Sequence, residues 1–165
     1  MNKKNKAFAT KIPKILKESK FSSLAIEVVK KLKQSGFQGY LVGGCVRDSL
    51  AGIKAKDFDV STNATPEEVR KIFRSSRIIG KRFRLVHVFS RSELIEVSTF
   101  RANASQKDNG SGVVKDSEGK ILRDNVWGTL EEDCIRRDFS INALYFDPIE
   151  NQLCDFHNGL QHIQK

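Results

Sequence analysis

The chain has 165 residues, of which 39% are hydrophobic and 30% charged, and its formal net charge is +9. This length and composition suit one domain with its own buried core. A cationic surface attracts polyanions before any specific contact forms, so nucleic acid is the expected partner. No apolar run reaches the roughly 18 residues of a membrane-spanning helix, and no signal-peptide core follows the lysine-rich start. These features argue against a membrane partner and favour the cytoplasm, and they do not indicate an oligomeric state.

The N-terminal segment is strongly basic. Residues 1–20 contain seven lysines and a single acid, Glu18, with little apolar periodicity. We expect a flexible basic arm here, which either contacts RNA or is simply a solvated tail. The folded domain is then expected over residues 21–165.

The first predicted elements are a helix and a strand. Apolar residues at helical spacing over 24–32 predict an amphipathic helix, which Gly36 would end. Residues 39–42 are typical of a short strand, and this strand leads directly into Gly43-Gly44. The glycine pair is therefore expected at the end of a strand.

The middle of the chain predicts two further strands after a second helix. A strand is expected over residues 58–61, and Thr65-Pro66-Glu67-Glu68 then supplies a helix cap, a proline at the first turn and a capping-box glutamate. The helix should cover about 66–74. Residues 84–89 and 94–99 are β-rich runs joined by a polar turn, which predicts a hairpin that extends the same sheet.

The last third begins with a polar segment. Residues 102–120 contain almost no apolar side chains, which predicts a mobile loop. Thr129-Leu130-Glu131-Glu132 opens another capping-box helix, and residues 143–146 predict a final strand. The expected fold class is α+β, with a mixed sheet of about five strands flanked by helices.

Two acids at a spacing of two, Asp57 and Asp59, lie on a predicted strand. Both carboxylates should project from one face while Phe58 points into the core. Neighbouring anions repel, and partial burial would raise one pKa unless a cation lies between them. Mg²⁺ prefers carboxylates with waters and substrate phosphates, and two such ions about 4 Å apart can drive nucleotide transfer. Acids at this spacing are also common on surfaces, so alone they indicate a metal site only weakly.

The segment Gly43-Gly44-Cys45-Val46-Arg47-Asp48 strengthens this interpretation. Glycines at the end of a strand let backbone N–H groups approach a triphosphate, and the start of a helix adds positive potential there. Arg47 adds a planar, permanently charged group for phosphate oxygens. A plain turn with a surface ion pair is the alternative, which the nearby acids make less attractive.

Residues 43–60 match the pattern GGxVRDxxxGxxxKDxDV, and residues 131–143 are similar to EEDxxRRDFTINA with Ser140 in place of threonine. On these two motifs the chain resembles the class II nucleotidyltransferase family, which contains bacterial poly(A) polymerases and CCA-adding enzymes. The resemblance implies a polymerase-β-like nucleotidyltransferase head. It also implies that Asp57 and Asp59 hold two Mg²⁺ ions, and that AMP from ATP is added to an RNA 3′-hydroxyl without a template.

The resemblance also implies roles for the other residues of these motifs. Gly43, Gly44 and Arg47 would bind the nucleotide. Glu96, which is polar among apolar strand neighbours, is the candidate third acid, although it could simply be exposed. The second motif would supply two arginines that face the ribose and phosphates, an acid that holds them, an asparagine that orients the loop and a further catalytic acid: Arg136, Arg137, Asp138, Asn142 and Glu131.

Without the resemblance, the second motif would be interpreted as ordinary helix ion pairs. Glu132–Arg136 and Asp133–Arg137 have the i,i+4 spacing of such pairs, each of which contributes only about 0.3–0.5 kcal/mol.

A basic stretch supports an RNA substrate. Eight basic residues and no acid occur over 69–92, which suits contacts to an RNA backbone, although a solvated basic face is the alternative. Residues 81–88 and 122–125 resemble poly(A) polymerases more than CCA-adding enzymes, which leaves the latter as the runner-up and a non-catalytic RNA-binding remnant as a third hypothesis. The resemblance covers about 38–160, and family members continue into helices that select the base, so ATP selection is not expected from these residues.

Overall fold

The computed structural model describes residues 12–163 except 82, 103–112, 116–120 and 125. The described part contains six α-helices: α1 (Lys14–Glu18), α2 (Ser23–Gln34), α3 (Gly44–Leu50), α4 (Pro66–Ile72), α5 (Leu130–Ile135) and α6 (Gly159–Ile163). A short 3-10 helix, Ser140–Asn142, precedes the final two strands. Among these described residues, no helix has the length and apolar character needed to cross a membrane.

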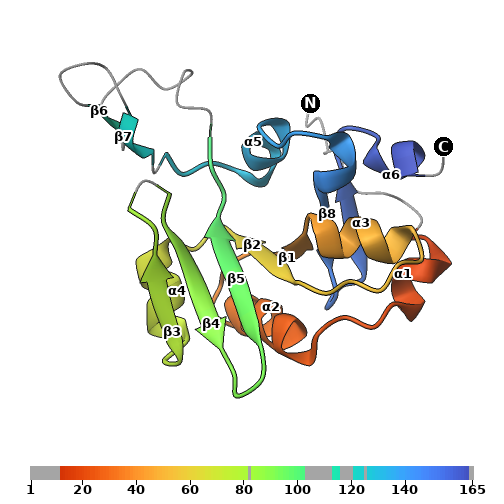
Figure 1. Ribbon diagram of the computed structural model, residues 1–165, viewed down its shortest axis with the longest axis horizontal. Coiled ribbons are helices and arrows are strands. Elements are labelled where there is room, and N and C mark those ends of the chain that lie inside the picture. The colour runs from red at the N-terminus through yellow and green to blue at the C-terminus, as the bar shows by residue number, and fades with distance from the viewer. Residues whose placement is uncertain (1–11, 82, 103–112, 116–120, 125, 164–165) are drawn as a thin grey trace.

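One mixed sheet of seven strands forms the centre of the fold (Figure 1). Its spatial order is β3-β4-β5-β2-β1-β8-β9, and only β2 and β5 run parallel. The strands are β1 (Gly39–Val42), β2 (Asp59–Thr62), β3 (Ser76–Ile79), β4 (Leu85–Phe89), β5 (Leu94–Thr99), β8 (Leu144–Asp147) and β9 (Gln152–Asp155). The α+β prediction is confirmed, with seven strands in place of about five because the short edge strands β3 and β9 were not predicted.

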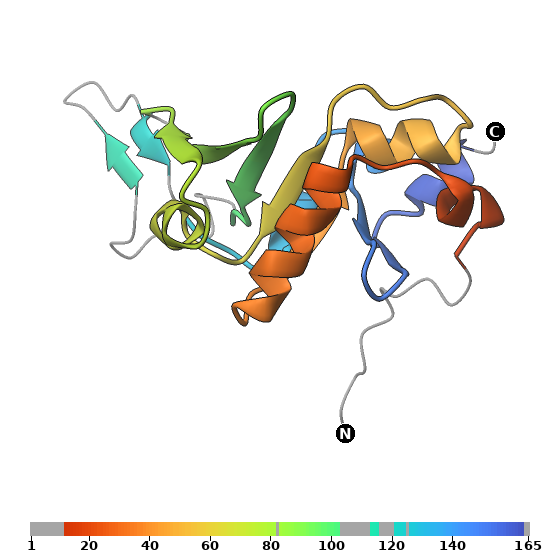
Figure 2. The same ribbon diagram turned by 90° about the horizontal axis from the view of Figure 1, so that it is seen from below.

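The two faces of the sheet are covered differently. On one face, α2 and α4 pack their apolar side chains against alternate strand residues such as Leu41, Val60 and Val97 in the main core. On the other face, α5 covers a smaller cluster that includes Tyr40, Phe100 and Tyr145. Figure 1 shows α2 and α4 behind the strands, and Figure 2, seen from below, shows α2 lying along the sheet. Helix α5 covers only part of the second face.

Both predicted helix caps are present and fix where these helices begin. Thr65 caps α4 and Thr129 caps α5, each in a reciprocal capping box with the glutamate three residues later. Helix α4 ends at Ile72 rather than near residue 74. Four donors at the start of each helix have no intrahelical partner, so these caps stabilise the short helices.

Part of the expected basic arm is folded. Lys14–Glu18 form α1, and the Leu16 side chain is 1% exposed in the main core, whereas residues 1–11 lie outside the described residues. Figures 1 and 2 show α1, α3 and α6 together at one end of the molecule. A single apolar side chain among lysines is too weak a pattern to predict this packing.

The expected loop over 102–120 lies mostly outside the described residues. Within it, Val113–Lys115 form β6, which pairs antiparallel with β7 (Ile121–Asp124) in a separate two-stranded sheet. For these three residues the loop prediction is wrong, since they adopt a strand through a pairing that their polar surroundings did not indicate.

The packing of α1 can be tested with two neighbouring residues. Leu16→Ala is expected to lower the free energy of unfolding by about 2–5 kcal/mol, because it leaves a cavity in the main core. Ile15→Ala is the matched control, since Ile15 is 41% exposed, and should change the free energy by less than about 0.5 kcal/mol. Urea denaturation would measure both, and equal effects would mean that α1 does not pack on the core.

Candidate active site

The turn between β1 and α3 depends on a glycine. Gly43 has φ +74° and ψ −133° and forms the N-cap of α3. A side chain at this position would meet no neighbouring atom, so the requirement for glycine comes from the backbone conformation rather than from space. Gly44 begins α3, and an added Cβ there would lie 3.6 Å from the Arg47 guanidinium.

Asp59 and Glu96 are brought together by the parallel pairing of β2 with β5. The two residues are direct partners in the register, so their side chains lie on the same face of the sheet. Asp57 precedes β2 and is exposed, and Phe58 packs against the main core as predicted. Burial, Glu96 and Asp57 raise the pKa of Asp59, while Arg137 opposes this shift. The three acids therefore form a negative site in which ionised Asp59 is disfavoured.

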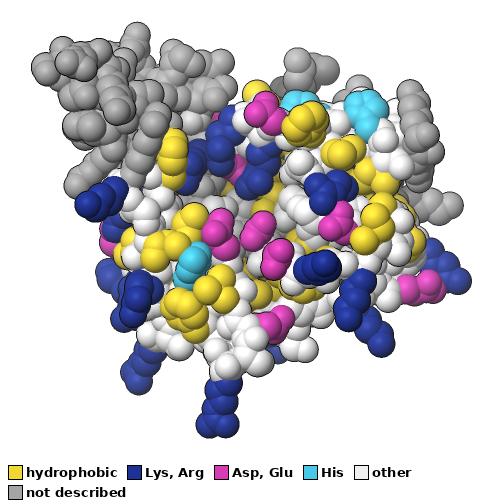
Figure 3. Space-filling view, viewed as in Figure 1, with side chains coloured by type: hydrophobic (Ala, Val, Ile, Leu, Met, Phe, Trp, Pro, Cys, Tyr) yellow, Lys and Arg dark blue, Asp and Glu magenta, His cyan; other side chains and the backbone are white. Residues whose placement is uncertain are grey.

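Glu96 also faces β4. His87 is its partner in the antiparallel register, and the His87 Nε2 atom lies 3.5 Å from the Glu96 carboxylate. The Glu96 side chain is 43% exposed. Glu96 is thus a partly exposed strand residue that lies next to Asp59. Figure 3 shows acidic side chains gathered in the middle of this face, with basic side chains above them.

A buried carboxylate, Asp133 on α5, holds the two motif arginines. The Asp133 side chain has no exposed surface. It accepts hydrogen bonds from the Arg136 Nε (2.9 Å) and Nη2 (2.5 Å) and from the Arg137 Nε (3.3 Å). These contacts confirm the Asp133–Arg137 pair of the i,i+4 interpretation and add an i,i+3 pair with Arg136. The last turn of α5 therefore carries a compact ion-pair network.

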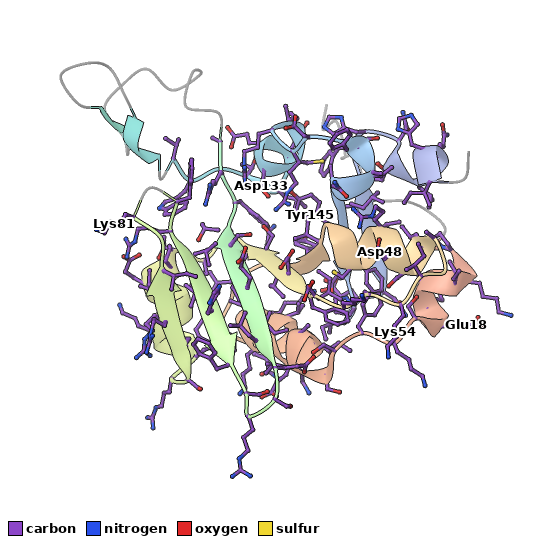
Figure 4. The ribbon with its side chains drawn as sticks, in the orientation of Figure 1. Glu18, Asp48, Lys54, Lys81, Asp133 and Tyr145 are labelled. Carbon is purple, nitrogen blue, oxygen red and sulfur yellow. The ribbon has the colours of Figure 1, made fainter. Side chains whose placement is uncertain are left out.

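Three further groups complete the shell around Asp133. The Tyr145 hydroxyl donates at 2.6 Å, the Arg101 backbone N–H at 3.0 Å and the Ser61 hydroxyl at 3.4 Å. Burial alone would raise the pKa of Asp133, but Arg137, Arg136 and the hydrogen bonds lower it below its usual value of 3.8. Figure 4 shows Asp133 next to Tyr145 beneath α5. Asp133 is therefore ionised and links α5 to β2 and β8.

The arginine-holding role expected for Asp138 belongs to Asp133. Asp138 is exposed and has no ion pair or side-chain hydrogen bond within the described part of the chain. Asp133 lies three and four residues before the arginines, on the same face of α5, whereas Asp138 comes after the helix has ended. That spacing was the available signal for the Asp133 contacts.

Arg47 and Asn142 join the two motifs in space. The Arg47 Nη1 donates to the Asn142 Oδ1 at 2.7 Å, although the residues are 95 positions apart. Asp48 accepts from the Arg47 Nε at 2.8 Å and pairs with Nη2 at 2.7 Å. Asn142 therefore orients Arg47 as well as ending the 3-10 helix. The guanidinium of Arg47 is held at the start of α3 beside Gly44.

Glu131 lies apart from the other acids. It is exposed and lines a separate cavity of about 510 Å³ together with Tyr40, Asn63 and Thr129. It is not among the charges that shift the pKa of Asp59. The structure therefore brings Glu96, and not Glu131, to the acid pair.

The carboxylates of Asp57 and Asp59 are of the chemical kind that a magnesium ion prefers. Within the described ranges, no group of three or more His, Cys, Asp or Glu side chains is arranged to hold a metal ion by itself. Asp57 and Asp59 nevertheless offer carboxylate oxygens, and their mutual repulsion is what a divalent cation would relieve. Mg²⁺ is commonly bound by one or two carboxylates with waters and substrate phosphates. The donor chemistry therefore agrees with magnesium.

Known proteins are similar to this chain in sequence and in fold. A family model described as the poly A polymerase head domain matches residues 39–165. The solved structure of the Bacillus stearothermophilus CCA-adding enzyme in complex with CTP superposes with a TM-score of 0.65 at 31% identity, covering 93% of this chain and 32% of that one. The fold and its charged site thus define a nucleotidyltransferase head, and the chain belongs to the poly A polymerase head-domain family.

Two curated relatives show how much of a longer protein this head represents. Poly(A) polymerase I of Haemophilus influenzae is 50% identical over 145 residues, covering 87% of this chain and 32% of that protein. The CCA-adding enzyme of Listeria monocytogenes is 41% identical over 123 residues, covering 74% of this chain and 29% of that protein. The chain therefore spans about a third of the length of these relatives.

Asp133 and Asp138 provide a matched test of the network. Asp133→Asn is expected to lower the free energy of unfolding by about 3–5 kcal/mol, because both arginines lose their buried counter-charge. Asp138→Asn should change it by less than about 0.5 kcal/mol, since this exposed carboxylate has no partner in the described part of the chain. Urea denaturation at neutral pH would measure both variants. A larger loss of unfolding free energy in Asp138→Asn than in Asp133→Asn would show that Asp138, and not Asp133, holds the arginines.

Proposed function

We propose that this chain is the catalytic head of a poly(A) polymerase, which adds AMP from ATP to RNA 3′ ends without a template. The observation that carries the proposal is the pairing of Asp59 with Glu96, with Arg137 close enough to act on the Asp59 charge. Negative and positive groups are thereby concentrated at one point of the sheet, as transfer between a hydroxyl and a triphosphate requires. The 50% identity with a poly(A) polymerase I supports the choice within the family.

Asp57 and Asp59 are the residues that would hold two magnesium ions. When bound, these ions would supply activation of the RNA 3′-hydroxyl and neutralisation of charge on the departing pyrophosphate. Glu96 is the third acid of the proposal, since it lies across from Asp59 on the neighbouring strand. Glu96 lies between Asp59 of β2 and His87 of β4 in the sheet.

The nucleotide is proposed to bind on the arginine side of the acids. Arg136 and Arg137 are held by Asp133, and Arg47 by Asn142, so these guanidinium groups are oriented before a ligand arrives. Preorganised donors stabilise developing charge more effectively than donors that must reorient. Gly43 and Gly44 would allow the triphosphate to approach the backbone, and the exposed carboxylate of Asp138 remains available to nucleotide hydroxyl groups.

A CCA-adding enzyme is the second candidate. It is favoured by the 41% identity with the Listeria monocytogenes enzyme and by the CTP complex of a structural relative at 31% identity. Both candidates share the acids and arginines described above. The RNA that accepts the nucleotide is therefore the better discriminator.

The metal-site proposal can be tested by thermal stability. Because the pKa of Asp59 is raised in the folded state, its ionised form disfavours folding at pH 7, and Asp59→Asn should melt at a higher temperature than the wild type in EDTA. The difference should shrink as the pH falls and wild-type Asp59 becomes protonated. Adding Mg²⁺ with ATP should raise the melting temperature of the wild type but not that of the variant.

An exposed acid outside the site provides the control for this measurement. Glu93→Gln, in the turn between β4 and β5, should keep the wild-type response to Mg²⁺ and ATP. An unchanged response in Asp59→Asn would refute the assignment of Asp59 as a metal ligand.

The enzymatic proposal can be tested by nucleotide transfer. The chain should transfer label from α-labelled ATP to an unstructured oligoribonucleotide as readily as to tRNA that lacks its CCA end, because a tailing enzyme accepts varied ends. Asp59→Asn should lose more than the roughly 10–100-fold that removal of a supporting residue costs at a metal site. Transfer restricted to tRNA, with CTP as donor, would favour the CCA-adding alternative. No transfer to any RNA would favour the non-catalytic hypothesis.

A further inference from the structure

Among the residues that the structure describes, no helix covers one face of β3, β4 and β5 beside the acids. The alternation along β4 and β5 shows this directly: Val86, Val88, Ile95 and Val97 are at most 3% exposed, whereas the residues between them are half-buried or exposed. The buried set faces α2 and α4, whereas α5 packs over β1 and β8 and contacts Ser61 of β2. Figure 1 shows these three strands with no helix in front of them.

Four residues on this face form a strip that we call the open-face strip: Arg77, His87, Phe89 and Leu94. Arg77 pairs with His87 across β3 and β4, and Phe89 pairs with Leu94 across β4 and β5. Phe89 is 36% and Leu94 46% exposed. The His87 and Phe89 rings meet edge to face at 6.1 Å, which leaves an aromatic surface open to solvent. In Figure 3 hydrophobic side chains and a histidine lie next to the central acids.

The strip is continuous with the proposed active site. His87 contacts Glu96, and Glu96 is the register partner of Asp59. Arg137, which follows α5, acts on Asp59, whereas the strip lies on β3, β4 and the start of β5, beyond Glu96 from Asp59. A triphosphate on the arginine side would therefore leave the strip side for the molecule that supplies the attacking hydroxyl.

Away from Glu93 and Glu96, the β3 and β4 side of the strip carries basic residues that favour a polyanion. Residues 69–92 contain no acid, and Arg77 and Arg91 are exposed and make no ion pair within the described part of the chain. Arg84 differs because it pairs with Glu67 at 2.5 Å, and Arg70 donates to backbone carbonyls of residues 73 and 74. Basic side chains beside exposed aromatic groups suit single-stranded nucleic acid, whose bases stack while its phosphates contact the cations.

We propose that the open-face strip binds the last bases of a single-stranded RNA and directs its 3′ end toward Glu96 and Asp59. The inference rests on the proposed function and adds the site of the acceptor strand. Phe89 and Leu94 provide the stacking surface, and Arg77 contacts a phosphate. Such contacts do not distinguish between bases, because every base has an aromatic face.

The test is RNA binding in EDTA without nucleotide, so that it does not depend on metal or catalysis. A fluorescent single-stranded oligoribonucleotide would be titrated with the whole chain and its variants, and anisotropy would give each Kd. Phe89→Ala should raise Kd by about tenfold, since stacking of a base on an aromatic ring typically contributes roughly a 5- to 150-fold change. Leu94→Ala, which removes apolar contact rather than an aromatic ring, should raise Kd about threefold. Phe89→Trp should restore the wild-type Kd. Arg77→Gln should reduce the slope of log K against log salt by about 0.7, the value for one phosphate of a single strand.

Matched controls come from surfaces away from the strip. Ile149→Ala removes an apolar side chain of similar exposure, 44%, between β8 and β9, and Lys30→Gln removes an exposed charge from α2. Both should bind RNA with a Kd within twofold of the wild type. Thermal melting would confirm that each variant is folded. If Phe89→Ala does not fold, the Kd of Leu94→Ala decides the test.

A photo-crosslink provides an independent measurement. A 4-thiouridine at the 3′ end of the oligoribonucleotide should attach to the peptide that contains β4 and β5. Attachment only to other peptides, or unchanged Kd values in both strip variants, would overturn the inference, as would the absence of RNA binding. Because the response to Mg²⁺ and ATP uses no RNA, the proposed metal site would survive this outcome.

Discussion

The Asp133 carboxylate has no exposed surface, so its charge must be compensated within the protein. Two arginines, a tyrosine hydroxyl, a serine hydroxyl and a backbone N–H provide that compensation. Burial raises the pKa of Tyr145, so its hydroxyl keeps its proton and can donate. An isolated surface pair would leave the arginines free to move, whereas a buried, fully hydrogen-bonded acid fixes their direction. The direction of the Arg136 and Arg137 side chains therefore depends on this one residue.

The acid side of the site has the opposite electrostatic character. Around Asp133 the positive groups exceed the single negative one, and its pKa falls. Around Asp59 the neighbouring acids add to the effect of burial, and its pKa rises. Arg137 contacts Asp133 and also acts on Asp59, so it connects the two environments. Excess negative charge at Asp59 is costly in the free protein and is suited to a bound cation.

The uneven coverage of the sheet explains where substrates can approach. Helices α2 and α4 pack against one face, while α5 covers only part of the other face, near β1, β8 and Ser61 of β2. The acids lie at the border between covered and open regions, with arginines on one side and aromatic and apolar side chains on the other. A nucleotide triphosphate would thus meet cationic groups on one side of the acids. The bases of an RNA acceptor strand would meet aromatic and apolar groups on the other side.

The sequence by itself determined the local features. These features depend on residues that are close in the chain, so the sequence alone predicted them. They are the capping boxes at Thr65 and Thr129, the strand that leads into Gly43 and the hairpin of β4 and β5. The short edge strands β3 and β9 and the helix around Leu16 depend on packing and pairing partners elsewhere in the fold, and the sequence did not predict them. Only the tertiary structure could place Glu96 beside Asp59, Asn142 on Arg47 and Asp133, rather than Asp138, beneath the arginines. The physical reason is that strand register and burial are set by the whole fold, whereas caps and turns are set by a few neighbouring residues.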